Sequence, residues 1–433
     1  MKNTLILLIA LNLFATYTSF SQINNQTEER IIKSVNQHEA YYSELLKEVV
    51  NINSGTMNFT GVKEVGMRLK TEFDEIGMNA KWIDGSPWNR AGHLVAETTG
   101  SEGPKLLLIG HLDTVFEPDS PFQTYQMLND SIMKGPGVAD MKGGDVIILM
   151  ALRALKEANL LGKMQIKVVM TGDEEKSGSP IEASKKVLTD AAEWADIALA
   201  FENADGDPKT IVVARRGSSG WTLTVNGKAA HSSQIFTNKV GVGAIYEASR
   251  ILNTFYQQLS KEEDLTFNPG VIVGGTTADM DKSTNSGTAF GKSNVVAQEV
   301  IVPGDIRAVS SQQLALAKET MQRIVENNYP GTSASIHFQQ GGYPPLTATK
   351  GNYELLALYN EVSIDLGSGK VEAVNPRNAG AADVSFTAGL VDMAIDGMGL
   401  SGADDHTINE TGDLSKLSVQ AKRAAVLMYR LVD

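Results

Sequence analysis

Histidine and carboxylate side chains follow several short apolar runs of this sequence. In Gly110-His-Leu-Asp-Thr114, His111 and Asp113 come directly after the apolar run 106–109. Ligands commonly bind at the carboxyl ends of parallel strands, which is where these two side chains would lie. Two residues apart on an extended backbone, they suit a metal-binding histidine and a carboxylate that fixes its tautomer. A purely structural hydrogen bond is the alternative.

A second segment places one carboxylate at the start of a helix. Asp140 lies within Gly135-Pro-Gly-Val-Ala-Asp-Met-Lys-Gly-Gly144, whose glycines permit a tight backbone. An aspartate in this position can cap the helix that follows. Its two oxygens can also bridge two cations, and the segment alone does not decide between these roles.

Adjacent carboxylates follow the next apolar run. Asp173, Glu174 and Glu175 come directly after residues 166–170. Three neighbouring carboxylates repel one another unless cations or solvent offset their charge. The segment is therefore either a solvated acidic turn or a site in which one glutamate binds metal and its neighbour transfers protons.

Two more donors stand at similar places. Glu202 follows the apolar run 197–201, and His406 lies in a glycine-rich loop after the run 393–395. With His111, Asp140 and Glu175 they make two imidazoles and three carboxylates, a set that suits zinc, cobalt or manganese. One tetrahedral zinc with a bound water needs fewer ligands. Five donors suit two ions about 3.5–4 Å apart that share a carboxylate.

Alternating strand and helix patterns must position these side chains. Helical periodicity over 22–50, 61–78 and 146–158 alternates with short apolar runs that are typical of buried strands. This order predicts an α/β fold with a mainly parallel sheet and helices on both faces. From Gly217 to Gly342 the pattern becomes that of a compact α+β unit. We therefore expect a first catalytic part over 22–216, an inserted domain over 217–342 and a second catalytic part over 343–433.

Within the inserted domain the sequence predicts two helices and about four strands. The helices are expected at 240–259 and 311–328. Residues 276–292 are rich in Thr, Ser, Gly and Asp, which predicts an exposed loop. Strands are expected over 221–225 and near Val271, Val295, Ile306 and Ile336.

Composition limits the class of protein and of partner. The 433 residues include no cysteine and carry a formal net charge of −13. The lack of cysteine excludes disulfides, thiolate zinc sites and cysteine nucleophiles. An acidic surface argues against nucleic acid or an anionic membrane as the main partner.

The first residues have the pattern of an export signal. Lys2 precedes the apolar run 5–15, and Ser19-Phe-Ser21 has the spacing of small residues found at a cleavage site. The run is too short to span a membrane, which takes about 20 residues. We expect a signal peptide over residues 1–21 and a secreted or periplasmic mature protein.

These motifs resemble the co-catalytic zinc metallopeptidase family of glutamate carboxypeptidase, aminoacylase, acetylornithine deacetylase and succinyl-diaminopimelate desuccinylase. The resemblance covers nearly all of the mature chain, and GHLDTV, GVADMKGG and GDEE are its most specific parts. It implies two Zn²⁺ per chain, with Co²⁺ or Mn²⁺ as substitutes, and a cis peptide bond after Asp140. The metal-ligand roles that it implies are His111 and Glu202 on one ion, Glu175 and His406 on the other, and Asp140 between them.

The resemblance also implies roles beyond the metal ligands. Glu174 becomes the general base, and Asp113 the partner of His111. In the inserted domain, which is a lid in this family, His231 reaches the active site of a second subunit and polarises the scissile carbonyl. Asn294 contacts substrate and Arg307 binds its carboxylate. A homodimer formed through the lid follows from the role of His231.

Two segments depart from the family pattern. The proline that usually follows the asparagine at position 294 is missing, and the run there is Val-Val-Ala-Gln-Glu. A glycine-rich segment whose backbone contacts the carboxylate end of the substrate is replaced by Ala379-Gly-Ala-Ala-Asp383. Neither change affects a predicted metal ligand, but both bear on substrate specificity.

Within the family the chain most resembles glutamate carboxypeptidase, because it has Glu202 and a single compact lid. This implies hydrolysis of an amide bond next to a free carboxylate, in a small peptide or an N-acyl amino acid. An acidic protein needs a local basic cluster to bind such an anion. The candidates are Arg307 with Lys209, Arg215 and Arg216, and Lys209 would bind the side-chain carboxylate of a C-terminal Glu or Asp.

Other functions remain open. An N-acyl-amino-acid deacylase or a dipeptidase would use the same scaffold and metal site. A non-catalytic zinc- or ligand-binding protein is an alternative of another class, although it would have no need for Glu174 as a base. A nucleotide or redox enzyme is disfavoured because no glycine-rich phosphate-binding motif follows a strand.

Overall fold

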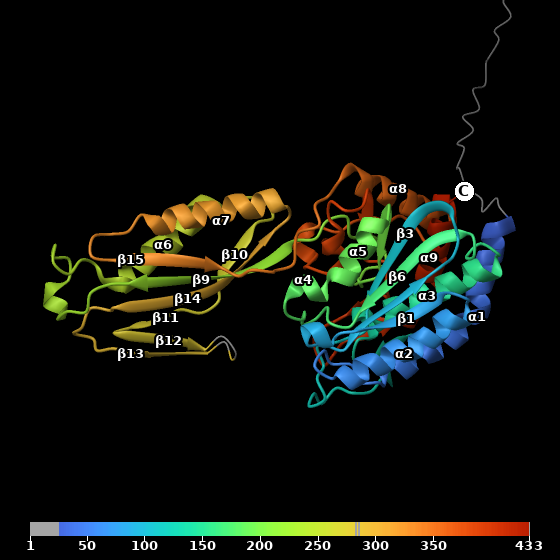
Figure 1. Cartoon of the computed structure of the whole chain (residues 1–433), viewed down its shortest axis with the longest axis horizontal. Helices are drawn as coiled ribbons and strands as arrows, with labels where there is room; N and C mark the ends of the chain where they lie inside the picture. Colours follow the sequence, from blue (N-terminus) through green and yellow to red (C-terminus); the bar gives the residue numbers. More distant parts are fainter. Residues whose placement is uncertain (1–25, 282–283, 285, 433) are drawn as a thin grey trace, which may run out of the picture.

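The computed structural model describes residues 26–281, 284 and 286–432, so the expected signal peptide lies outside the described residues. The chain folds into a large α/β unit from which a narrower unit extends lengthwise (Figure 1). We call the narrower unit the lid. Across the described residues, every helix is either too short or too polar to cross a membrane.

A six-stranded sheet forms the centre of the large unit, in the order β1-β2-β6-β3-β7-β17. The strands from β6 to β17 are parallel, whereas β1 and β2 run antiparallel at one edge. The mainly parallel sheet expected from the sequence is therefore present. Its strands are β1 (Asn79–Asp84), β2 (Gly92–Glu97), β3 (Glu102–His111), β6 (Met164–Thr171), β7 (Ile197–Ala200) and β17 (Met393–Ile395).

Alternate residues of β3 explain why helices cover both faces. Leu106 and Leu108 belong to one buried cluster and Leu107 and Ile109 to another, as expected for side chains that alternate along a strand. The first cluster includes residues of α3, a helix that is buried along almost its whole length. The helices of this unit are α1 (Gln26–Val50), α2 (Phe59–Glu75), α3 (Gly143–Glu157), α4 (Ile181–Ser184), α5 (Lys186–Trp194), α8 (Lys350–Asp365) and α9 (Leu417–Val432).

Short strands complete the large unit and hold two of the loops that carry predicted metal ligands. A four-stranded sheet has the order β18-β19-β5-β4, and β16 pairs with β8. The segment that carries Asp140 follows β5, and the loop between β18 and β19 carries His406. Pairing of β19 with β5 therefore brings these two segments together. The strands are β4 (Gln126–Met127), β5 (Ile132–Lys134), β8 (Thr210–Ile211), β16 (Glu372–Ala373), β18 (Gly402–Ala403) and β19 (Thr411–Asp413).

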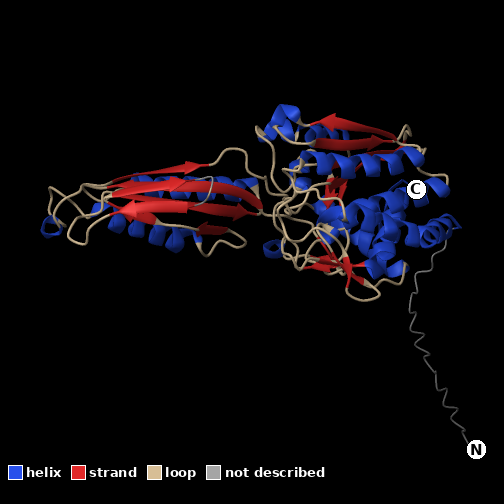
Figure 2. Ribbon diagram, turned by 90° about the horizontal axis from the view of Figure 1, so that it is seen from below, coloured by secondary structure: helices blue, strands red, loops and turns tan. Residues whose placement is uncertain are grey.

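The lid has its own buried core on one face of an antiparallel sheet. Strand β9 alternates buried and partly exposed residues along its length, so only one face is packed. The helices pack on that face, and among the described residues of the lid the other face carries no helix (Figure 2). The elements are β9 (Gly217–Asn226), β10 (Thr266–Pro269), β11 (Val273–Gly275), β14 (Glu299–Ala308), β15 (Ser333–Phe338), α6 (Gly243–Leu259) and α7 (Ser311–Glu326).

The expectation of a loop over residues 276–292 is wrong. The segment forms an antiparallel hairpin of β12 (Thr277–Asp281) and β13 (Ser286–Phe290). Most of its described side chains are exposed, so the polar composition of the segment reflects its exposure to solvent and does not indicate a loop. Threonines and an aromatic residue favour extended backbone, which is consistent with the hairpin.

Two of the strands expected in the lid are displaced. Val271 lies between β10 and β11 instead of within a strand. Val295 also lies outside the strands, where it forms an isolated bridge with His231. The strand expected near Ile306 is present as β14, which pairs with β9 along ten residues.

Candidate functional site

His111 lies at the last position of β3, where the strand delivers it to the carboxyl edge of the sheet. The side chain is 1% exposed. Its Nε2 atom lies 3.0 Å from Oδ1 of Asp140 and 3.4 Å from Oε1 of Glu202. Strands β3 and β7 are neighbours, so Glu202, which follows β7, emerges beside His111. These three residues form the first group of metal-type donors.

A second group uses the other oxygen of Asp140. Nε2 of His406 lies 2.9 Å from Oδ2 of Asp140 and 3.2 Å from Oε2 of Glu175. In each of the two groups, the donor atoms all lie within 4.8 Å of one another. Asp140 is shared between the groups, and the peptide bond from Asp140 to Met141 is cis, as the resemblance implies. The structure thus brings together all five residues that the sequence predicts as ligands.

The electrostatics of the two groups suit divalent cations. Burial raises the pKa of Glu175 to about 7 and that of Glu202 to about 7, and in both cases the charge of Asp140 adds to the rise. Oε1 of Glu175 is buried and has no hydrogen-bond partner among the residues that the structure describes. Closely spaced buried carboxylates with free oxygens are costly unless a cation neutralises them. The residues present therefore fit two ions joined by Asp140.

Glu174 lies next to this centre. It lines a cleft of about 560 Å³ together with Glu175 and residues at the root of the lid. Burial raises the pKa of its carboxyl well above the ordinary value, and the nearby carboxylates of Asp383 and Glu175 contribute. A carboxylate with a raised pKa is a stronger base once it is ionised, which suits a role in proton transfer.

Asp113 contacts His111 differently from the expectation. The closer contact of the His111 Nδ1 atom is the main-chain oxygen of Asp113, at 3.0 Å, and the carboxylate lies 3.5 Å away. The carboxylate accepts hydrogen bonds from the amides of Glu174 and Glu175, at 3.0 and 3.2 Å, and from Thr56 Oγ1 at 2.6 Å. Asp113 therefore holds the segment with the predicted base in addition to orienting His111.

Glu410 supports Asp140 and was not identified from the sequence. Its buried carboxylate accepts hydrogen bonds from the amides of Gly137, Ala139 and Asp140, at 3.1, 2.9 and 3.1 Å. It lies four residues after His406, so one segment both supplies a donor and fixes the loop of the shared aspartate. A glutamate after a loop histidine gives no sequence signal of this role.

Asp396 supports Glu202 in a similar way. It accepts hydrogen bonds from the amide of Glu202 at 3.1 Å and from Nε of Arg215 at 2.7 Å. Arg215 is buried and also donates to the main-chain oxygen of Gly380. The expectation that Arg215 belongs to a basic cluster for substrate is therefore wrong, because its guanidinium is held within the protein.

The three lid residues with predicted roles lie at opposite ends of the lid. Arg307 is on β14 near the large unit, opposite Ser218 of β9, and Nε donates to Asp305 Oδ2 at 3.1 Å. His231 and Asn294 lie together beyond the far end of β9, where the amide of Ser232 donates to the oxygen of Asn294. Ten residues of β9 span about 30 Å, and the lid extends away from the large unit (Figure 1). Because His231 follows the far end of β9, it is remote from the metal-type donors of its own chain.

Two further arginines, Arg216 and Arg377, lie near Arg307 at the root of the lid. Thr266, to which Arg216 donates, is the strand partner of Arg307, and burial together with the charges of Arg307 and Arg377 lowers the pKa of Arg216. Arg216 donates to Thr266 Oγ1 and to the main-chain oxygen of Arg377, each at 3.0 Å. Arg377 was missed from the sequence because it lies in a segment without a motif.

Lys209 is not brought to this group by any described contact. Its amide donates to Asp207 Oδ1, and its main-chain oxygen accepts from the amide of Glu372. Among the described residues, the structure therefore gives no contact that joins Lys209 to the metal-type donors or to Arg307.

Comparisons with known proteins agree with this geometry. The chain is 24% identical to carboxypeptidase G2 of Pseudomonas sp. (strain RS-16) over 429 residues, which cover 98% of this chain and 97% of the relative. It is 28% identical to a probable succinyl-diaminopimelate desuccinylase of Staphylococcus aureus (strain MRSA252) over 382 residues, or 82% of this chain and 89% of that protein.

Solved structures share the fold. Aminopeptidase PepT from Bacillus cereus matches with a TM-score of 0.71 and 20% identity over 91% of this chain and 99% of its own. The Bacillus subtilis YXEP protein, described as a dinuclear metal-binding peptidase, matches with a TM-score of 0.63 and 15% identity over 92% and 99%. The model of peptidase family M20/M25/M40 matches residues 107–430. The chain therefore belongs to this family of metal-dependent hydrolases.

Proposed function

We propose that the protein is an exported dinuclear zinc hydrolase of the carboxypeptidase type, which cleaves an amide bond next to a free C-terminal carboxylate. The observation that carries the proposal is the sharing of Asp140 between two groups of donors, with Glu174 beside them. When bound, such a pair of ions supplies Lewis-acid polarisation and lowers the pKa of coordinated water.

The residues of the chain have separate tasks in this reaction. Glu174 accepts a proton from the attacking water and returns it to the nitrogen of the leaving amine. Asp113 holds the main chain of Glu174 in place. His231 of a second subunit would donate to the carbonyl oxygen of the substrate, because the His231 of the same chain lies at the far end of the lid.

Arg307 is proposed to bind the carboxylate of the leaving amino acid. A guanidinium can hold a carboxylate with two parallel hydrogen bonds. Arg216 and Arg377 lie beside it and offset the negative field of the protein. Arg216 and Arg377, instead of Lys209, are the candidates for binding a second carboxylate, on the side chain of a C-terminal Glu or Asp.

The test compares free and amidated substrates. Purified protein without residues 1–21, loaded with zinc, is assayed on dipeptides, their C-terminal amides and N-acyl amino acids. Free-acid dipeptides should be cleaved and the amides should be poor substrates. Arg307→Lys should lower kcat/KM for free acids about tenfold or more, because lysine keeps the charge but cannot form two parallel hydrogen bonds to a carboxylate. Arg323→Lys, on the exposed side of α7, is the matched control.

The same panel separates the alternatives. A preference for N-acyl amino acids over peptides would assign the protein as a deacylase. Cleavage restricted to dipeptides would make it a dipeptidase. Equal cleavage of free acids and amides would contradict the carboxypeptidase proposal, and zinc binding without any hydrolysis would leave a non-catalytic binding protein.

A further inference from the structure

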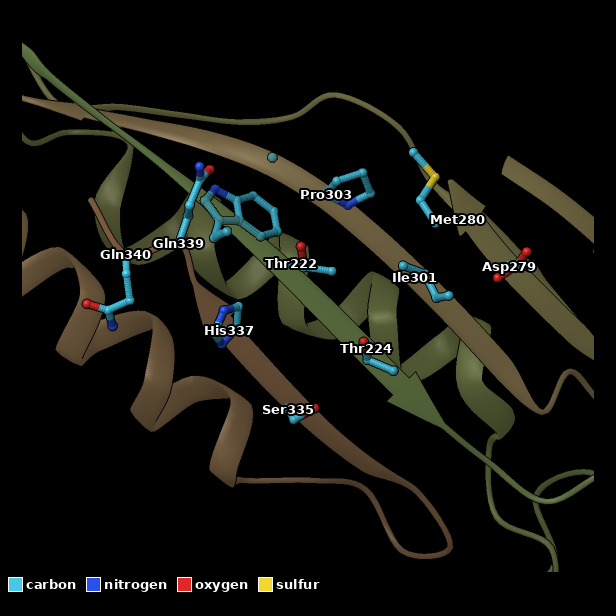
Figure 3. Close-up of a pocket in the computed structure, with 13 residues that line it drawn as sticks. Thr222, Thr224, Asp279, Met280, Ile301, Pro303, Ser335, His337, Gln339 and Gln340 are labelled. Carbon is cyan, nitrogen blue, oxygen red and sulfur yellow. The ribbon is translucent and has the colours of Figure 1, made fainter. Parts of the chain in front are cut away.

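The predicted base Glu174 borders an open cleft on one side. Gln339 and Gln340 line this cleft and also the adjoining one of about 810 Å³, on the face of the lid sheet that carries no helix (Figure 3). The hydrogen bonds that Glu174 makes within the described part of the chain use its main-chain amide and its main-chain oxygen. The position of its carboxylate therefore depends on how the main chain around it is held.

Each residue of the segment 171–175, which we call the base segment, has a hydrogen-bond partner from another part of the chain. In the order of the segment, the partners are Asp383 for Thr171, His93 for Gly172, Lys185 for Asp173, and Asp113 for Glu174 and Glu175. Two of these partners also contact each other, because Nζ of Lys185 lies 2.9 Å from Oδ1 of Asp383. Lys185 and Asp383 therefore form one unit that holds the segment on either side of Gly172.

Lys185 is buried together with two carboxylates. Its Nζ atom lies 3.2 Å from Oδ1 of Asp173 and 2.9 Å from Oδ1 of Asp383, and the three side chains are 1%, 0% and 3% exposed. One lysine balances one aspartate, so the second aspartate leaves a net negative charge in the interior. Such a charge is costly to bury, and a buried ion pair is weak evidence for a contribution to stability. A role in holding the base segment accounts for Asp383 better than a role in stability does.

Asp383 stands at the end of a loop that begins at the root of the lid. At the start of this loop, over residues 379–383, the main-chain oxygen of Ala379 accepts from the amide of Arg216 at 3.3 Å. At its end, Asp383 contacts the base segment. The loop thus links the neighbourhood of Arg307 to the predicted base. A reaction depends on the exact placement of its catalytic groups, so the anchor of this loop bears on the rate.

We propose that Lys185 and Asp383 are positioning residues for Glu174, and that together they hold the base segment against the loop 379–383. The proposal rests on the proposed hydrolase function, in which Glu174 is the base. Both side chains are buried and act through the main chain of the segment, so they have no need to touch the substrate. Loss of the pair should lower kcat and leave KM and zinc content close to their original values.

The first variant is Asp383→Asn. It keeps the size of the side chain and leaves Lys185 paired with Asp173, so the interior stays balanced in charge and the protein should fold. On the best free-acid substrate of the panel, kcat should fall about tenfold, with KM changed less than about twofold. Asp196→Asn is the matched control, because its carboxylate accepts from the amide of Lys105 at 2.8 Å before the start of β7, at the opposite edge of the sheet.

A second variant removes one contact and no charge. Thr171→Val loses the hydroxyl that donates to Asp383 and should lower kcat about threefold, again with KM unchanged. Thr387→Val is its control, because Thr387 is equally buried and its hydroxyl donates to the oxygen of Val384 at 2.8 Å. Hydrogen exchange of the zinc-loaded proteins gives a measurement that does not depend on turnover. The amides of the base segment should exchange faster in Asp383→Asn and Thr171→Val than in either control.

A double-mutant cycle separates positioning from a general structural role. If Asp383 acts through the base, Asp383→Asn should add less than about a twofold loss of kcat to Glu174→Gln. Fully additive losses, or unchanged kcat and exchange in both variants, would overturn the proposal. Loss of zinc from Asp383→Asn would also overturn it, because Asp383 lies beside His111 and Glu202 around a narrow internal cavity. Absence of hydrolysis by the unchanged zinc-loaded protein would instead refute the proposed function itself and, with it, the role of the pair.

Discussion

The hydroxyl of Tyr343 donates a hydrogen bond of 2.8 Å to the main-chain oxygen of Glu174. Tyr343 belongs to the segment by which the chain leaves the lid, and its own main-chain oxygen accepts from the amide of Ser218, where the chain enters the lid. Its ring packs edge-on against Phe386 of the large unit. One side chain therefore joins both lid connections to the segment that carries the predicted base.

Removing this hydroxyl should affect turnover more than binding. Tyr343→Phe keeps the ring but frees the main chain of Glu174, so kcat should fall about fivefold, as expected for the loss of about 1 kcal/mol. KM and metal content should stay near their original values. Tyr353→Phe, an exposed tyrosine on α8, is the control. A loss of thermal stability with unchanged kcat would mean that Tyr343 has only a structural role.

The metal content should be two ions per chain. Asp140 faces both His111 and His406, so each group of donors should bind one ion. Elemental analysis of zinc-saturated protein should give a value near two. Chelation should abolish hydrolysis and lower Tm, because an ion that binds only the folded state stabilises it by about 2.7 kcal/mol at one hundred times its Kd. A firm count of one would exclude the bridging role of Asp140.

Glu174→Gln should separate catalysis from metal binding. The substitution keeps the size of the side chain and removes the base, so kcat should fall by about 10²–10⁴. Zinc content should remain at the level of the unchanged protein. Glu193→Gln, on the exposed side of α5, should leave kcat unaltered. If Glu174→Gln retained full turnover, the base would lie elsewhere and Glu175 would be the next candidate.

Mixing two inactive variants tests the contribution of a second subunit. In a dimer of Glu174→Gln with His231→Ala, one site has both an intact base and an intact histidine from its partner. Random exchange of equal amounts of two twofold dimers should restore about one quarter of full activity. Each variant alone should remain inactive. An active monomer in sedimentation experiments would rule out this arrangement.

Much of the metal centre could be predicted because strand ends are visible in the sequence. An apolar run followed by His111 or by Glu202 indicates a side chain at the carboxyl edge of a parallel sheet, and neighbouring strands bring such residues together. The cis bond after Asp140 came from the resemblance and is present. The mainly parallel sheet followed from the order of strands and helices.

The supporting residues could not be predicted in this way. Glu410 and Asp396 act through main-chain amides, which any sequence provides, so their partners become visible only in three dimensions. Arg215 and Arg216 are adjacent in sequence but have different surroundings, because one is enclosed against Asp396 and the other points toward Thr266. The hairpin over 277–290 was not predicted because its polar composition resembles that of a loop.

The donors of the metal centre come from segments that are made at very different times. The group of His111 and Glu202 can assemble from the first half of the chain, but the second group waits for His406, and the Asp140 loop waits for Glu410. Chains grow from the N-terminus at about 5–20 residues per second. A nascent chain consequently lacks the complete set of donors until His406 and Glu410 have been translated.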